Sequence, residues 1–214
     1  MIVTIDGPAG AGKSSIAREV ARTLQFAFLD TGAMYRCVTY AALQAEISFT
    51  NQHELLAVAQ ECQIDFQNDQ IILNEVPVDD RIRTPEVTRH IRYAADHPEI
   101  RAFLNGQQRR IAANQDIVTE GRDQGTEVFP HAECKVFLTA SPEERAKRRW
   151  QQLQTAGGST TVEEILAAQN QRDLEDETRK VGRLRPADDA TILNTDGLSP
   201  TEVLERILQI VAAC

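Results

Sequence analysis

One segment near the N-terminus carries the pattern G-x-x-x-x-G-K-[ST]: Gly7-Pro8-Ala9-Gly10-Ala11-Gly12-Lys13-Ser14. A short apolar run, Met1–Asp6, precedes it, and Ser14–Leu24 follows with Ile16, Val20 and Leu24 at helical spacing. This order of strand, Gly-rich turn and helix is typical of a phosphate-binding loop (P-loop). The glycines let successive backbone N–H groups surround a phosphate, and the helix N-terminus adds its positive dipole.

The loop predicts ATP binding with Mg²⁺. Lys13 is placed to reach the β- and γ-phosphates, and the Ser14 hydroxyl is a ligand for Mg²⁺. Glu120 is a second candidate for the metal, either directly or through water. The residues expected to bind ATP are Gly7, Pro8, Ala9, Gly10, Ala11, Gly12, Lys13, Ser14 and Ser15.

Other P-loop classes need motifs that the sequence lacks. A GTPase would carry N-K-x-D to read guanine, and a motor-type ATPase would carry an Asp-Glu pair after an apolar strand. Neither is found, which leaves kinases of small molecules.

Strand-like and helix-like segments alternate along the 214 residues, which indicates a parallel sheet built from βαβ units. We predict a five-stranded P-loop NTPase-type α/β fold with helices on both faces. The expected strands are 1–6, 27–30, 116–120, 135–139 and 190–194. The expected helices are 14–24, a helix beginning at Thr31, 41–63, 84–114, 142–154, 160–180 and 200–213.

Two segments interrupt this alternation. Residues 64–67, 70–74 and 76–79 are short and strand-like, which predicts a small antiparallel insertion at about 64–80. The charged stretch at about 150–182, with Gly157-Gly158 inside it, is expected to form a short helical lid. We therefore assign 1–36 and 96–214 to a kinase core and 37–95 to an acceptor-binding region within a single compact chain.

Composition excludes several function classes. The formal net charge is −9, whereas proteins that bind nucleic acid polymers usually carry a basic surface. No apolar run approaches the roughly 20 residues that span a bilayer. The four cysteines form no C-x-x-C pair, so a structural zinc site is not expected. We expect a cytoplasmic monomer with reduced thiols and no nucleic acid or membrane partner.

Candidate acceptor residues follow the second and third core strands. Thr31 stands at a predicted helix start, where free N–H groups bind anions, and Arg36 lies about one and a half turns further on. Arg122 can hold a phosphate, and Asp123 can accept a hydrogen bond from the exocyclic amine that distinguishes cytosine from uracil. Ligands of open parallel sheets gather beyond the carboxyl ends of strands, where these segments lie.

Together these segments resemble the bacterial cytidylate kinase family over nearly the whole chain. The resemblance rests on the P-loop, on Asp30-Thr31-Gly32-Ala33-Met34-Tyr35-Arg36, and on Ile82-Arg83-Thr84-Pro85-Glu86-Val87 with Arg101. It continues through Gly121-Arg122-Asp123-Gln124-Gly125-Thr126-Glu127-Val128-Phe129-Pro130, Arg145-Ala146-Lys147-Arg148-Arg149, and Gln171-Arg172-Asp173 with Asp176 and Arg179.

The resemblance implies transfer of the γ-phosphoryl group of ATP to CMP or dCMP, giving CDP or dCDP and ADP. It implies that Thr31, Arg36 and Arg122 hold the acceptor phosphate, and that Arg101 and Asp123 read the cytosine. It further implies that Arg172 and Asp176 reach the ribose and phosphate. Together with Lys13, the catalytic cations would be the lid arginines Arg149, Arg172 and Arg179.

Alternative acceptors remain open. The family commonly has a serine that helps to bind the base where this chain has Arg92, so UMP is a second candidate acceptor. A non-nucleotide alcohol such as shikimate would need a carboxylate base, for which Asp30 and Glu120 are the candidates. A phosphate acceptor, with a second pKa near ~6, needs no such base. A nucleotide-binding regulator without turnover is the alternative from another class, and the intact Lys13, Ser14 and Arg36 disfavour it.

Overall fold

The computed structural model describes residues 1–67, 70–155 and 160–214. These residues form two compact units. The first unit comprises Met1–Phe28 and Asn114–Cys214, and the second comprises Leu29–Ala113. Residues 68–69 of the predicted insertion, and Gly157-Gly158 of the predicted lid, lie outside the described residues.

A five-stranded sheet organises the core, with strand order β2-β6-β1-β7-β8. The strands are β1 (Ile2–Asp6), β2 (Ala27–Asp30), β6 (Ile117–Gly121), β7 (Cys134–Thr139) and β8 (Thr191–Asn194). Strand β1 runs parallel to β6, with Ile2 opposite Ile117, and parallel to β7, with Val3 opposite Cys134. Strand β8 runs parallel to β7. The predicted five-stranded α/β fold is confirmed.

Among the described residues, the α-helices of the first unit are α1 (Lys13–Leu24), α6 (Pro142–Thr155), α7 (Val162–Thr178) and α8 (Pro200–Ala213). Local chemistry explains where two of them begin. Thr161 and Glu164 form a capping box at α7, and Ser199 and Glu202 form another at α8. Each box satisfies N–H groups that the first turn of a helix leaves without partners. The helix predicted over 200–213 is confirmed.

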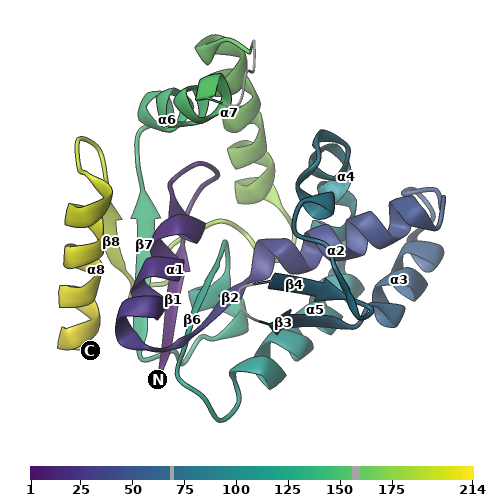
Figure 1. Ribbon diagram of the computed structural model, residues 1–214, viewed down its shortest axis with the longest axis horizontal. Helices are drawn as coiled ribbons and strands as arrows, with labels where there is room; N and C mark the ends of the chain where they lie inside the picture. Colours follow the sequence, from purple (N-terminus) through teal and green to yellow (C-terminus); the bar gives the residue numbers. More distant parts are fainter. Residues whose placement is uncertain (68–69, 156–159) are drawn as a thin grey trace. The chain divides into compact units, whose positions relative to one another are not determined.

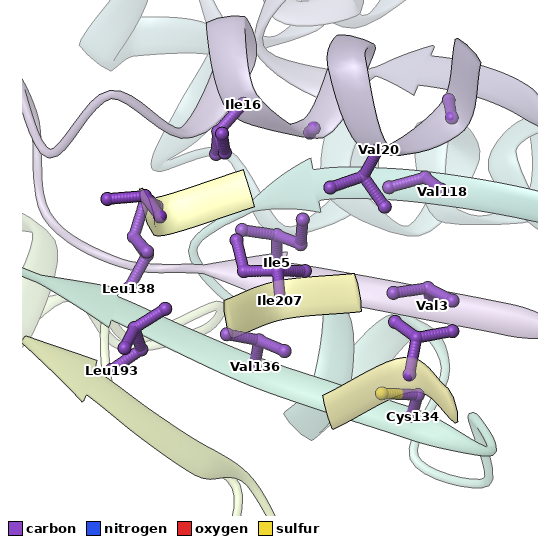
Figure 2. Close-up of a cluster of buried hydrophobic side chains, with 14 residues drawn as sticks. Val3, Ile5, Ile16, Val20, Val118, Cys134, Val136, Leu138, Leu193 and Ile207 are labelled. Atoms are coloured by element: carbon purple, nitrogen blue, oxygen red, sulfur yellow. The ribbon is translucent and has the colours of Figure 1, made fainter. Parts of the chain in front are cut away.

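A hydrophobic core lies where α1 and α8 pack beside the sheet (Figure 1). Alternate residues of a strand point to one face, so Val3 and Ile5 of β1 share this core with Val136 of β7. Ile16 of α1 and Ile207 of α8 pack against them, as Figure 2 shows. Burying this face fixes β1 and α1, and thereby fixes both ends of the P-loop.

Between β6 and β7 the chain forms a π-helical turn, η2 (Gln124–Val128), which the sequence did not predict. The N–H group of Phe129 donates to the carbonyl of Gln124 across 2.7 Å. The N–H groups of Gln124 and Gly125 instead donate to the buried Asp6 carboxylate, at 2.9 and 2.7 Å. A carboxylate brought from another strand therefore orders this turn.

The second unit is mainly helical, with α2 (Thr31–Gln44), α3 (Gln52–Glu61), η1 (Arg81–Arg83), α4 (Pro85–Ala95) and α5 (Pro98–Ala112). The expectation of continuous helices over 41–63 and 84–114 was wrong. Glu46 adopts a left-handed φ of 53°, and the Asn51 side chain caps a new helix by accepting from Glu54 N–H. Pro98 ends the other run because proline disfavours helical backbone at the preceding residue, here the extended His97.

The predicted insertion is confirmed as a separate three-stranded antiparallel sheet: β3 (Ile64–Gln67), β4 (Gln70–Leu73) and β5 (Val76–Pro77). Asn74 and Glu75 connect β4 to β5 with φ angles of 48° and 68°. Two consecutive residues with positive φ are the signature of the tight hairpin turns that match strand twist. Asn74 suits this role since it tolerates the left-handed region, and its side chain also accepts from Gln63 N–H.

Within the described ranges no helix combines the length and the apolar character that crossing a lipid bilayer requires.

Candidate active site

The P-loop connects β1 to α1 at the carboxyl end of the sheet. Gly7 has a φ of 152°, and a Cβ atom there would lie 2.0 Å from the backbone oxygen of Leu138. Gly12 has a φ of 86° and immediately precedes Lys13, the first residue of α1. Glycine is therefore needed at position 7 for space and at position 12 for backbone conformation.

Lys13 is buried at the base of the loop, with 5% of its surface exposed. Its Nζ donates to the carbonyl of Pro8 across 2.7 Å. Burial lowers the pKa of Lys13 to about 7; the Arg122 and Arg172 cations act in the same direction, and Glu120 opposes them. This site already concentrates positive charge, so an anion bound there would stabilise the ammonium form.

The Ser14 hydroxyl and the Glu120 carboxylate meet at the end of β6, where Ser14 Oγ donates to Glu120 Oε1 across 2.9 Å. Among the described residues no group of three or more His, Cys, Asp or Glu side chains could hold a metal ion by itself. One hydroxyl and one carboxylate suit Mg²⁺, which usually keeps several waters and takes its remaining ligands from substrate phosphates.

A cluster of alternating charges lies on α7 and the loop after β6. Asp176 accepts from Arg122 Nε at 2.8 Å and from Arg179 Nη2 at 2.6 Å. Burial raises the pKa of Asp176, but Arg122, Arg179 and Arg172 outweigh it and hold that pKa below its usual range. Asp176 stays ionised and fixes the two guanidinium groups that contact it.

Asp123 and Asp6 are both buried near the start of η2, each with 4% of its surface exposed. Burial raises the pKa of Asp6 to about 6, although the N–H groups of Gly125 and Gln124 oppose this shift. Asp6 was not among the predicted site residues. A carboxylate ending an apolar strand directly before the P-loop was the signal available for it.

In the second unit, Asp30 caps α2 by accepting from Ala33 N–H across 2.9 Å, and Thr31 is the buried first residue of that helix. Arg36 donates to the carbonyl of Ile82 and to Thr88 Oγ1, at 3.1 and 2.9 Å. The guanidinium of Arg36 is therefore already oriented by η1 and α4.

Arg101 of α5 is also held within the second unit. Its Nη1 donates to the carbonyl of Ala95 across 3.0 Å, and its guanidinium carbon lies 5.4 Å from the centre of the Tyr35 ring. Arg92, which takes the place of the family's usual serine, is exposed, and its guanidinium carbon lies 5.3 Å from the Tyr93 ring centre.

The predicted site residues of the first unit are not all gathered together. Contacts and electrostatic interactions connect Lys13, Ser14, Glu120, Arg122, Arg172, Asp176 and Arg179. Arg149 is exposed on α6, where its Nη1 lies 3.4 Å from Gln152 Oε1 of the same helix. Its neighbour Arg148 is bound to Glu144 and Thr195.

Arg145 and Asp173 were likewise given no predicted role, although both contact the P-loop directly. A spacing of four and then three residues places Gln169, Asp173 and Asp176 on one face of α7. That spacing of buried polar residues was the signal that could have found Asp173.

The fold and the loop geometry define a P-loop nucleotide-binding protein. Solved structures resemble the chain over almost its whole length. TT1252 from Thermus thermophilus is 23% identical, with a TM-score of 0.50 and coverage of 100% of this chain and 96% of its own. A shikimate kinase from Bacteroides thetaiotaomicron is 14% identical, with a TM-score of 0.51 and coverage of 99% and 98%. At these identities the likeness concerns the fold alone.

The sequence profile of the family described as "Cytidylate kinase" matches residues 3–213, and the chain belongs to this family. A cytidylate kinase of Rhodopirellula baltica is 61% identical, covering 100% of this chain and 93% of that relative. A cytidylate kinase of Desulfitobacterium hafniense is 43% identical, covering 97% and 91%. The protein is therefore an ATP-dependent nucleoside monophosphate kinase.

Proposed function

We propose that this enzyme transfers the γ-phosphoryl group of ATP to CMP or dCMP, giving ADP and CDP or dCDP. The observation that carries the proposal is the junction of the P-loop with the charged cluster, where buried Lys13 lies near Arg122 and Arg172. The names of the two relatives described above support cytidine nucleotides as the acceptors.

ATP would be held by the loop from Gly7 to Ser15. When ATP binds, Lys13 Nζ would leave the Pro8 carbonyl for the β- and γ-phosphate oxygens. Bound Mg²⁺, held through Ser14 and Glu120, would neutralise phosphate charge. Both groups already lie within hydrogen-bonding distance of each other, so little rearrangement of the protein would be needed.

The acceptor phosphate would bind to Thr31, Arg36 and Arg122. An arginine can bind a phosphate with two parallel N–H donors, and neighbouring groups already orient Arg36 and Arg122. Arg172 and Asp176 would contact the ribose and phosphate.

Cytosine would be read by Arg101 and Asp123. A carboxylate accepts from the exocyclic amine of cytosine, whereas uracil presents a carbonyl oxygen at the same place and would be repelled. Arg92 stands where the family's serine would add a contact. UMP is therefore the second candidate acceptor, since one contact that could favour cytosine is replaced.

The transfer would proceed in line and without a general base. The acceptor oxygen belongs to a phosphate that is already largely ionised at neutral pH, with a second pKa near ~6. The protein would supply positioning and positive charge. Lys13, Arg172 and Arg179 would stabilise the equatorial oxygens, and Arg149 would join them from α6. We further propose that the enzyme acts as a cytoplasmic monomer without nucleic acid or membrane partners.

The test is an ADP-release assay with ATP and Mg²⁺, offering CMP, dCMP, UMP and AMP in parallel. Turnover with CMP and dCMP well above UMP is expected if Arg101 and Asp123 read the base. Equal rates with CMP and UMP would instead indicate that Arg92, in place of the family's serine, weakens the discrimination between cytosine and uracil. Turnover with none of these nucleotides would refute the acceptor assignment and leave only the fold.

A further inference from the structure

Two side chains without an assigned role, Arg145 and Asp173, hold a single residue of the P-loop. Asp173 Oδ1 of α7 accepts from the N–H group of Ala9 at 3.2 Å. Arg145 Nη1 of α6 donates to the carbonyl of Ala9 at 2.7 Å and pairs with Asp173 Oδ2 at 2.6 Å. Ala9, Arg145 and Asp173 thus form a closed ring of hydrogen bonds.

This ring is buried and well ordered by its surroundings. Arg145 has 3% and Asp173 8% of their surfaces exposed. Arg145 Nε also donates to the carbonyl of Ala140, at the end of β7, across 3.2 Å. The guanidinium of Arg145 is therefore held by the sheet as well as by the loop. These contacts restrict rotation of the side chain, which an exposed arginine would undergo freely.

The position of Ala9 within the loop gives the ring its significance. Ala9 is the third residue of the G-x-x-x-x-G-K-[ST] segment, and the N–H groups that follow it are those that surround a phosphate. With both polar groups of Ala9 engaged, the two peptide planes that flank it have fixed directions. The backbone N–H groups from Gly10 onward are thereby oriented together toward the phosphate-binding position.

The charge of Asp173 makes Arg145 necessary. A carboxylate one hydrogen bond away from an anion-binding loop would repel the triphosphate. Arg145 cancels that charge while Asp173 keeps its acceptor atom on Ala9 N–H. Gln169, one turn earlier on α7, fills the neighbouring space, because a Cβ added to Gly10 would lie 2.5 Å from its Nε2.

We propose that Arg145 and Asp173 are positioning residues that set the shape of the ATP-binding loop. One turn after Asp173, the same helix face carries Asp176, which holds Arg122. This inference rests on the proposed binding of ATP to the loop, and it adds two residues to which that proposal gives no role.

The experiment measures ATP affinity by calorimetry without any acceptor, then the ATP and CMP KM values separately. Asp173→Ala should raise the ATP dissociation constant at least about tenfold, since a hydrogen bond to a charged group is lost beside the ligand. Asp173→Asn keeps an acceptor oxygen and should recover most of this affinity. The CMP KM should change much less than the ATP KM in both variants.

Glu177→Ala is the matched control, because it removes the same charge from the exposed face of α7. It should leave ATP affinity within about twofold of the starting protein, since exposed charges contribute little. Because the calorimetry contains no CMP, failure of the cytidylate assignment would leave this readout intact. Equal rises in the ATP and CMP KM values would overturn the proposal, as would equal damage from Asp173→Ala and Asp173→Asn.

A second pair of variants tests the charge argument. Arg145→Gln leaves Asp173 uncompensated beside the loop and should weaken ATP binding more than the double variant Arg145→Gln/Asp173→Asn. A merely structural pair predicts the reverse order, because the double variant loses more. If Asp173→Ala and Arg145→Gln both fail to fold, as judged by thermal melting, the pair is a core ion pair and the proposal is wrong.

Discussion

Lys13 is the residue of the nucleotide site whose charge state depends most clearly on its surroundings. It is buried, its pKa is lowered to about 7, and its Nζ rests on the Pro8 carbonyl. A phosphate in the loop would replace that carbonyl and restore the full positive charge. The charge contact should matter most in the transition state, where the transferring phosphoryl group carries charge on its equatorial oxygens.

Lys13→Ala should therefore lower kcat by roughly 10²–10³, as removal of one transition-state donor does in other enzymes. Steady-state kinetics with saturating ATP and CMP measures it. Lys147→Ala, which removes an exposed lysine of α6, serves as the control and should retain normal kcat. A kcat for Lys13→Ala within a few-fold of the starting enzyme would contradict the assigned role.

Arg36→Ala should raise the KM for CMP strongly, by about 10–100-fold for a lost charge-assisted phosphate contact, and leave the KM for ATP almost unchanged. Arg89→Ala, an exposed arginine of α4, is the control. Since Arg36 also donates to Ile82 and Thr88, a thermal melt should accompany the kinetics. A near-normal CMP KM in Arg36→Ala would exclude it from the acceptor site.

Asp6 predicts a pH dependence of stability. Its pKa is raised from 3.8 to about 6 in the folded protein, so the folded state binds the proton more tightly than the unfolded state. Its contribution is fully present below the unfolded value of 3.8 and is lost as the pH rises through about 6. A shift of about two units corresponds to about 3 kcal/mol.

Asp6→Asn should remove this titration. As the pH rises from about 4 to about 7, the starting protein should lose up to about 3 kcal/mol of unfolding free energy relative to the variant. Urea denaturation across that range measures the difference. An offset that does not depend on pH is expected too, because Asp6 accepts from Gln124 and Gly125 with separate oxygens and Asn has only one. A difference between the two proteins that stays constant with pH would show that Asp6 keeps an ordinary pKa.

At the level of elements, the P-loop depends on how closely β1 approaches β7. A side chain at Gly7 would meet the Leu138 backbone oxygen, which cannot move without disturbing the sheet. Gly12 has open space around it and needs only its positive φ. Glycine is therefore required at position 7 because of a steric clash and at position 12 because of the backbone conformation.

Gly7→Ala should cost clearly more stability than Gly12→Ala, for which the left-handed backbone alone predicts about 1–2 kcal/mol. Chemical denaturation of both variants gives the comparison. Gly106→Ala is a useful reference because Gly106 lies inside α5 with open space around it, and alanine there should stabilise by about 0.5–1 kcal/mol. Equal losses for Gly7→Ala and Gly12→Ala would rule out the steric argument.

Elements with strong local signals could be predicted from the sequence. The P-loop, the helix at 200–213 and the antiparallel insertion carry glycine spacing, a capping box and strand periodicity. The π-helical turn at Gln124–Val128 has no such local signal, because the carboxylate that orders it comes from Asp6, more than a hundred residues earlier. The hydrogen bonds that Arg145 and Asp173 make with Ala9 also join residues far apart in the sequence, so no local pattern predicts them.

Helix boundaries in the second unit were harder to predict. The apolar spacing over 41–63 continues across a break that depends on Glu46 in the left-handed region and on an Asn51 cap. Asparagine before a helical run was the available signal for the second helix. The side-chain roles assigned to the acceptor residues remain predictions, since they rest on motif resemblance and on the local contacts of each unit.

At the level of the whole molecule, the net charge of −9 is unfavourable for binding anions, so anion binding must depend on local clusters of Lys and Arg side chains. Lys13, Arg122, Arg172 and Arg179 gather in the first unit, while Arg36 and Arg101 are held in the second. Such a kinase must also keep water from the γ-phosphate, or ATP would be hydrolysed without transfer. The preference for phosphoryl transfer over hydrolysis of ATP is thus a property that depends on the whole chain.

The most direct test of the central claim follows the fate of the γ-phosphoryl group. The enzyme is incubated with Mg²⁺, CMP and ATP labelled at the γ-phosphate, and the products are separated by chromatography. We predict that nearly all released label is found in CDP, and that this transfer stops when the metal is chelated. Recovery of the label as inorganic phosphate, or its retention in ATP when CMP is present, would contradict the claim.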